Sequence, residues 1–173
     1  SINGKLALDL KDKKLNIGYC MSFVFNFKTA PIENSKNVSK LLYIKFSNNT
    51  SVSLILKSPG VLSIKEGDKE ESTLKGLYTN EFIVLVVNFI VENNELNCYC
   101  YANGENTSMP MKYKNNLEVG KDTIESIEFF DNFYGQITSV TMFLLKEKAE
   151  PSINSKTFLP IFKNFIEGFH KKK

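Results

Sequence analysis

Hydrophobic and polar residues alternate with a period of two along most of this 173-residue chain. Because side chains on a β-strand point alternately to its two faces, this pattern predicts strands with one buried face. The predicted strands cover residues 5–10, 19–28, 40–46, 51–57, 61–66, 82–91, 95–102, 109–113, 123–130 and 135–145. The segment 82–91 is apolar on both faces, which is typical of a central strand that is covered on both sides.

Turn residues separate these segments. The Asn-Asn pair at 93–94 predicts a two-residue hairpin loop, and the Asn-Gly pair at 103–104 is a stronger turn signal, because a type I′ turn needs positive φ at both central positions. The Ser-Pro-Gly run at 58–60 predicts another turn, and the polar stretch 66–73 is expected to be a solvated loop. Short strands at regular spacing indicate an all-β fold, a sandwich of two antiparallel sheets.

The alternation also predicts which side chains fill the space between the two sheets. We expect seven hydrophobic residues from four of the strands to be largely buried there. These are Phe23, Phe25, Leu54, Leu85, Val87, Ile137 and Val140.

One short α-helix is predicted near the C-terminus, over residues 157–170. Its apolar residues recur three and four positions apart, so they form one stripe along a helix. The stripe consists of Phe158, Ile161, Phe162, Phe165, Ile166 and Phe169. We expect Phe162, Phe165 and Phe169 to contact the sandwich or an adjoining domain. We interpret residues 1–173 as a single domain excised from a larger protein.

Composition narrows the range of functions. The chain has 22 basic and 19 acidic residues, and every basic residue is a lysine. Since base recognition relies on the arginine guanidinium, a sequence-specific nucleic-acid partner is not expected. His170 is the single histidine and lies near the end of the chain, so neither a His-based triad nor a multi-histidine metal site is expected. No apolar run reaches the roughly twenty residues of a membrane-spanning helix, so no membrane span is expected.

The three cysteines predict a reducing compartment. Cys20, Cys98 and Cys100 are odd in number and lack the spacing of a disulfide framework. Cys98 and Cys100 point to the same face of one predicted strand, where we expect buried and unreactive thiols. The expected localisation is therefore cytoplasmic.

The acidic residues do not predict a catalytic or metal site. Glu125 and Glu128 are three positions apart on a predicted strand, so we expect them to point to opposite faces and not to form a glycosidase pair. Asp131, Asn132 and Asp122 are the best calcium candidates, and we interpret them as solvated turn residues. No glycine-rich phosphate loop is present. We therefore expect no catalytic residue, no metal and no cofactor, and we predict that the protein is not an enzyme.

Three segments carry a resemblance to a known superfamily: 16–27 (NIGYCMSFVFNF), 81–91 followed by 96–104 (LNCYCYANG), and 133–144 (FYGQITSVTMFL). Their order resembles that of concanavalin A-like jelly rolls of the laminin-G and pentraxin type. The chain departs from that pattern in having no tryptophan. The last segment, followed by a polar stretch and an apolar helix, is most similar to the lectin-like domain of BEACH-domain proteins of the neurobeachin and Chediak–Higashi type.

This resemblance implies a concanavalin A-like jelly roll and a non-catalytic role. The chain would be a lectin-like interaction domain in a large intracellular membrane-trafficking scaffold, cytoplasmic and peripheral to membranes. Its partner would be a protein or the adjoining domains of the same chain. The alternative is a carbohydrate-binding module or lectin of a secreted or surface protein, with a glycan as the ligand.

Overall fold

The computed structural model describes residues 6–13, 15–18, 20–29, 38–57, 60–74, 81–102, 105–106, 111–113 and 116–145. Within these ranges the protein consists of β-strands and one short 3-10 helix, η1 (Lys11–Lys13). The predicted helix over 157–170, with Phe162, Phe165 and Phe169, lies outside the described residues.

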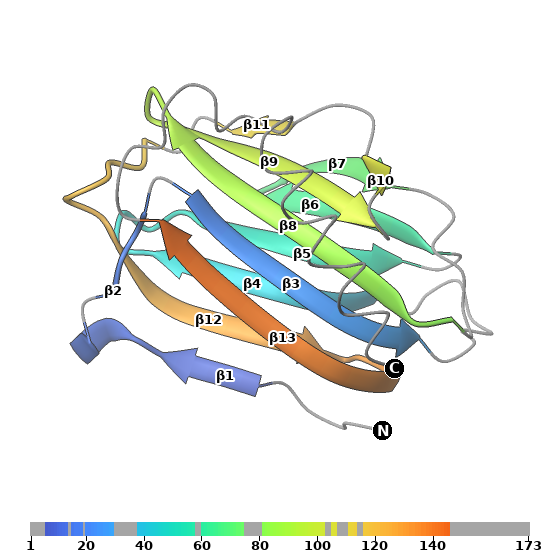
Figure 1. The fold of residues 1–173 in the computed structure, drawn as a ribbon. Coiled ribbons are helices and arrows are strands. Elements are labelled where there is room, and N and C mark those ends of the chain that lie inside the picture. Colours follow the sequence, from blue (N-terminus) through green and yellow to red (C-terminus); the bar gives the residue numbers. More distant parts are fainter. Residues whose placement is uncertain are drawn as a thin grey trace.

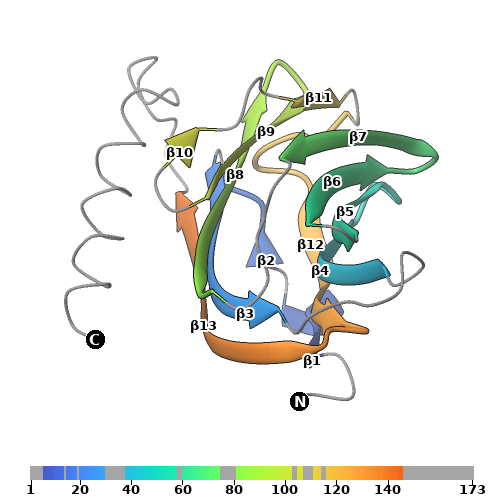
Figure 2. The ribbon, with the colours of Figure 1, turned by 90° about the vertical axis from the view of Figure 1, so that its right-hand side faces the viewer.

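The strands form two antiparallel sheets that lie against each other as separate layers (Figures 1 and 2). The strands are β1 (Leu6–Asp9), β2 (Leu15–Asn16), β3 (Cys20–Thr29), β4 (Val38–Phe46), β5 (Ser51–Lys57), β6 (Val61–Glu66), β7 (Lys69–Leu74), β8 (Ile83–Glu92), β9 (Glu95–Ala102), β10 (Glu105–Asn106), β11 (Met111–Tyr113), β12 (Thr123–Asp131) and β13 (Gly135–Leu145). The seven-stranded sheet has the order β1-β12-β4-β5-β6-β7, with β2 also pairing β12. The six-stranded sheet has the order β10-β9-β8-β3-β13, with β11 also pairing β9. The predicted all-β sandwich is confirmed.

Aromatic side chains fill the middle of the sandwich. Phe23, Phe25 and Phe27 alternate along β3 and are fully buried against Phe129 and Phe130 of β12. The rings of Phe25 and Phe130 lie edge to face with centroids 5.8 Å apart, the arrangement that the ring quadrupole favours. Burying one such side chain contributes about 1.5 to 3 kcal/mol, so this cluster is a main source of stability.

The loop between β8 and β9 has the predicted form. Asn93 and Asn94 are its two central residues, and their φ angles are 52° and 60°. Asparagine tolerates this left-handed region better than most residues. The tight connection fixes the register of β8 against β9. Strand β9 has the bounds predicted for it, 95–102. Strand β8 covers Ile83–Glu92, one residue later than the predicted 82–91.

The prediction of a solvated loop over 66–73 is wrong. Residues Lys69–Leu74 form β7, an edge strand that pairs with β6 and begins after a two-residue turn at 67–68. Gly67 has φ +56°, which allows this tight turn. An edge strand needs no apolar face to pair through its backbone, so the polar side chains concealed it in the sequence.

Two of the seven predicted core residues are only partly buried. Ile137 and Val140 pack against the core but stay partly exposed, because β13 is the last strand of its sheet and has a neighbour on one side only. The other five, Phe23, Phe25, Leu54, Leu85 and Val87, are completely buried as predicted.

Candidate functional site

The outer face of the seven-stranded sheet carries a group of polar and charged side chains, which we call the polar face. Pairing of β12 with β4 and of β4 with β5 places Glu128, Tyr43 and Ser53 in one row across the sheet. Their inward neighbours, such as Leu42 and Ile44, are buried in the core. The polar face comprises Lys40, Tyr43 and Lys45 of β4, Ser53 of β5, and Glu125 and Glu128 of β12.

A β-bulge in β12 brings Glu125 to this face. Ile124 and Ile127 are three positions apart, yet both are buried in the core, because the register shifts between Ile124 and Ser126. Two successive residues, Glu125 and Ser126, therefore face outward. The expectation that Glu125 and Glu128 lie on opposite faces is wrong for this reason.

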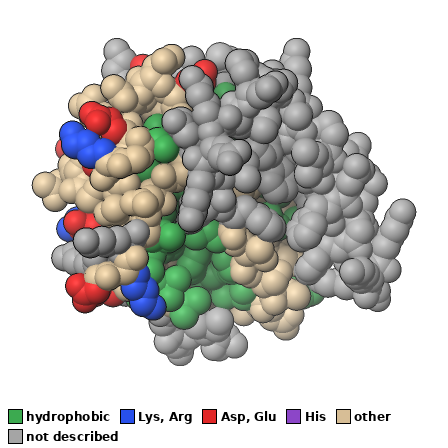
Figure 3. Space-filling model, turned by 60° about the vertical axis from the view of Figure 1, so that its left-hand side comes forward, with side chains coloured by type: hydrophobic (Ala, Val, Ile, Leu, Met, Phe, Trp, Pro, Cys, Tyr) green, Lys and Arg blue, Asp and Glu red, His purple; other side chains and the backbone are tan. Residues whose placement is uncertain are grey.

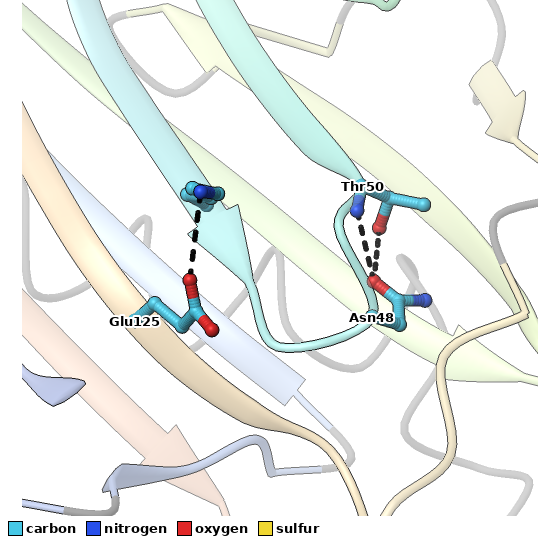
Figure 4. A network of polar contacts seen from close by, with 4 residues as sticks. Asn48, Thr50 and Glu125 are labelled. Carbon is cyan, nitrogen blue, oxygen red and sulfur yellow. Dashed lines mark hydrogen bonds and ion pairs between the residues drawn. The ribbon is translucent and has the colours of Figure 1, made fainter.

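Glu125 is engaged in an ion pair. Its Oε2 lies 3.7 Å from Nζ of Lys45, on the neighbouring strand β4 (Figure 4). Both side chains are partly exposed, so the pair contributes little to stability. It places an ammonium and a carboxylate next to each other on the polar face.

Tyr43 is the aromatic member of the polar face. Nζ of Lys40 lies 5.0 Å from the centroid of its ring, a cation–π contact, and Glu128 is its register partner on β12. The ring thus provides an apolar surface with charged groups of both signs around it. Such a surface can contact the C–H groups of a ligand while its neighbours donate and accept hydrogen bonds.

The β4–β5 turn borders this face and has its own polar contacts (Figure 4). Asn48 Oδ1 accepts hydrogen bonds from the backbone N–H of Thr50 at 3.1 Å and from its hydroxyl at 2.6 Å. Asn49, between them, has φ 67°. These contacts hold the turn in one shape and so fix the end of β4 near Lys45.

The calcium candidates do not come together as a site. Asp122 is buried rather than solvated: one carboxylate oxygen accepts from the Ser47 hydroxyl at 3.2 Å and the other from Glu118 N–H at 2.7 Å. Asn132 donates to the carbonyl of Val38 at 3.1 Å. These residues hold turns in place, and among the described residues no cluster of His, Cys, Asp and Glu could bind a metal ion.

The three cysteines are buried free thiols. Cys98 and Cys100 face the space between the sheets, and burial together with the contact to Cys100 raises the pKa of Cys98. Burial raises the pKa of Cys20 to about 12. The predicted burial of Cys98 and Cys100 is confirmed, and their low reactivity stays a prediction.

Hydrophobic side chains also reach the surface of the molecule. Figure 3 shows one side of the molecule, where hydrophobic side chains gather next to charged and polar ones. Leu6 and Leu8 of the edge strand β1 are exposed, and Ile137 and Val140 of the edge strand β13 are partly exposed.

No helix in the described part of the chain combines the length and hydrophobicity needed to cross a membrane.

No protein-family model matches the sequence, and a comparison with curated proteins gives no match. Solved structures do share the architecture. A heptameric SAP-like pentraxin from Limulus polyphemus superimposes with a TM-score of 0.56, covering 92% of this chain and 75% of that chain at 12% identity. The CBM40 module of Ruminococcus gnavus IT-sialidase, solved with α2,3-sialyllactose, gives a TM-score of 0.55, 92% and 94% coverage, and 11% identity.

The botulinum neurotoxin serotype G binding domain gives a TM-score of 0.63 at 13% identity, covering 96% of this chain and 40% of that chain. The chain shares the two-sheet jelly-roll fold of these proteins. The predicted concanavalin A-like architecture is confirmed at this level, and these identities concern the fold alone.

The sequence considered alone pointed to Glu125 and Glu128 only as a rejected carboxylate pair, and it did not point to the other residues of the polar face. Its candidate contact residues, Phe162, Phe165 and Phe169, lie outside the described residues. A usable signal was present, since Tyr43 and Lys45 alternate with buried residues of β4 and had to point outward.

Proposed function

We propose that this chain is a non-catalytic binding domain that recognises carbohydrate through the polar face. The observation that carries the proposal is the position of Tyr43, an aromatic ring with Lys40 over it and Glu128 beside it in register. A sugar presents C–H groups that pack on an aromatic ring and hydroxyls that bond to charged side chains. The shared fold with a module solved with α2,3-sialyllactose supports this class of ligand.

We propose a non-catalytic role because the carboxylate of Glu125 and the cysteine thiols are engaged in contacts or buried. Glu125, brought to the same face as Glu128 by the bulge, is held in an ion pair with Lys45. Cys20, Cys98 and Cys100 are buried thiols. Within the described ranges, these groups are occupied by structural contacts and do not form a nucleophile with a neighbouring base.

A glycan array probed with the whole chain tests the proposal. We expect a restricted set of sugars to bind, and Tyr43→Ala to lower the affinity by about tenfold or more, since aromatic anchors carry much of the energy at binding sites. Tyr134→Ala is the matched control, because Tyr134 is exposed but lies in the connection between β12 and β13. Binding that is absent, or that both variants reduce equally, contradicts the polar face as a sugar site.

A second candidate is a protein-interaction domain in an intracellular membrane-trafficking scaffold, cytoplasmic and peripheral to membranes. The three thiols outside any disulfide favour a reducing compartment, and the 133–144 segment resembles the lectin-like domain of BEACH-domain proteins. Its partner would be a protein or an adjoining domain. A silent glycan array, with recovery of trafficking proteins from a cytosolic extract that Tyr43→Ala abolishes, would favour this candidate over the sugar site.

A further inference from the structure

The middle of the outer face of the six-stranded sheet is buried, and part of it is hydrophobic. Cys20 and Val24 of β3 and Val84 and Val86 of β8 form a second hydrophobic cluster, separate from the core, which we call the outer cluster. Each of these four side chains is at most 5% exposed. Register pairs Val24 with Val86 and so confirms that they share one face.

None of the described strands covers this cluster. In Figure 2, the strands of the seven-stranded sheet all lie on the opposite, inner side of the six-stranded sheet. Burial of Cys20, Val24, Val84 and Val86 therefore requires a cover that the described strands do not supply.

We propose that the C-terminal segment 157–170 docks as a helix on the outer cluster, with the stripe that contains Phe162, Phe165 and Phe169 facing Cys20, Val24, Val84 and Val86.

The connection favours this segment of the same chain over a second molecule. Strand β13 ends at Leu145 beside β3, in the sheet that carries the outer cluster, and residues 146–173 follow it. The distance from β13 across β3 and β8 to β9 is about 14 Å. At about 3.3 Å per residue, an extended segment 146–156 is longer than this distance, so it can connect β13 to a helix on the outer cluster. Tethering also gives the stripe a high effective concentration at this face.

The dimensions of the two surfaces match. A helical stripe from Phe158 to Phe169 is about 17 Å long. The outer cluster extends along β8 from Val84 to the partly buried Ile90, which is about 20 Å on a strand. Six apolar side chains can therefore lie along the whole cluster.

Buried polar groups on the same face weaken the docking. Both polar side-chain atoms of Asn26 and the Oδ1 atom of Asn97 are buried without a hydrogen-bond partner. An apolar stripe cannot satisfy these groups, and each unpaired group costs free energy. The helix is then held less firmly than a core strand, and it opens and recloses without unfolding of the sandwich.

The reactivity of Cys20 tests this docking in the full chain. In the parent protein we expect slow labelling of Cys20 by a thiol reagent, since burial raises its pKa to about 12. Phe165→Asp should raise the labelling rate of Cys20 by about tenfold or more through local opening. Asn164→Asp, which adds the same charge on the other side of the predicted helix, should leave it unchanged. Cys98 and Cys100, in the core between the sheets, should stay protected in both variants.

Equal Cys20 labelling in Phe165→Asp and the parent would overturn the proposal. If all three thiols react together in Phe165→Asp, the variant has unfolded, and a crosslink in the otherwise unchanged chain decides. A photo-crosslinking phenylalanine analogue at position 165 should join to Cys20–Thr29 or Ile83–Glu92 of the same molecule. Crosslinks to other segments, or only between two molecules, would also overturn it.

Discussion

The hydroxyl of Ser22 donates a hydrogen bond of 2.6 Å to Oδ1 of Asn88, and both side chains are buried on the outer face of the six-stranded sheet. The two residues are register partners on the adjacent central strands β3 and β8. This buried polar pair links the two strands through side chains as well as through the backbone.

Replacing one partner of this pair leaves the other buried without a hydrogen bond. Each single replacement should therefore lower the free energy of unfolding by more than its share of the loss in the double variant. Ser22→Ala leaves the buried Asn88 oxygen without a donor, and we expect the free energy of unfolding to fall by about 1 to 3 kcal/mol. Asn88→Leu should have a similar effect. The double variant should lose less than the sum of the two, as measured in a denaturant double-mutant cycle. Strict additivity would contradict a direct interaction.

Two leucines at equivalent alternating positions should differ strongly in their contribution to stability. Leu54 is completely buried, whereas Leu8, on the edge strand β1, is 44% exposed. Leu54→Ala should lower the free energy of unfolding by about 2 to 5 kcal/mol. Leu8→Ala should lower it by less than about 1 kcal/mol, since less apolar surface returns to water. Thermal or urea unfolding of both variants checks this, and equal losses would contradict the assignment of β1 as an open edge.

The hairpin between β8 and β9 should respond to the backbone preference of position 94. Asn94 has φ 60°, which a residue with an ordinary side chain adopts at a cost of about 1 to 2 kcal/mol. Asn94→Ala should therefore destabilise the protein, and Asn94→Gly should leave stability equal or slightly higher. Urea midpoints of the two variants give the comparison, and the opposite order would show that the side-chain amide matters more than φ.

Glu66 should make the stability depend on pH. Burial raises the pKa of its carboxyl above the ordinary 4.5, against a smaller lowering by Lys69, and its Oε2 has no hydrogen-bond partner. The protonated form is therefore favoured in the folded state. As pH rises above the ordinary value, the unfolded chain releases its proton first and the free energy of unfolding falls.

Glu66→Gln, which stays uncharged, should thus be more stable than the parent at neutral pH. This difference in stability should vanish once the pH falls below the ordinary pKa, because the Glu66 carboxyl is then protonated in both the folded and the unfolded chain. Unfolding curves at several pH values measure it. Glu70→Gln is a control of opposite sign, because the hydrogen bond and charge of Lys57 lower the pKa of Glu70.

Alternation of hydrophobic and polar residues was sufficient to predict the bounds of strands that have one buried face. The bounds of β5, β6 and β13 agree with the predicted segments 51–57, 61–66 and 135–145. In β5 and β6 apolar side chains recur on one face, and their burial is the physical cause that produces the pattern.

The pattern could not show features that depend on a strand's neighbours. Strand β7 pairs through its backbone, and Ile137 is partly exposed because nothing pairs beyond β13. The polar face likewise depends on the pairing of β4 with β12, which are far apart in the sequence. The outward direction of Tyr43 was readable from alternation, but its proximity to Glu128 was not.

The bulge in β12 determines where this strand tolerates a change of length. Deletion of Glu125 would leave Ile124 opposite Phe46 and Ser126 opposite Lys45, so the strand would become regular and each later residue would keep its face. Deletion of Ile127 would instead turn Glu128 into the core. Glu125 is therefore a position where the chain can lose one residue without inverting the strand.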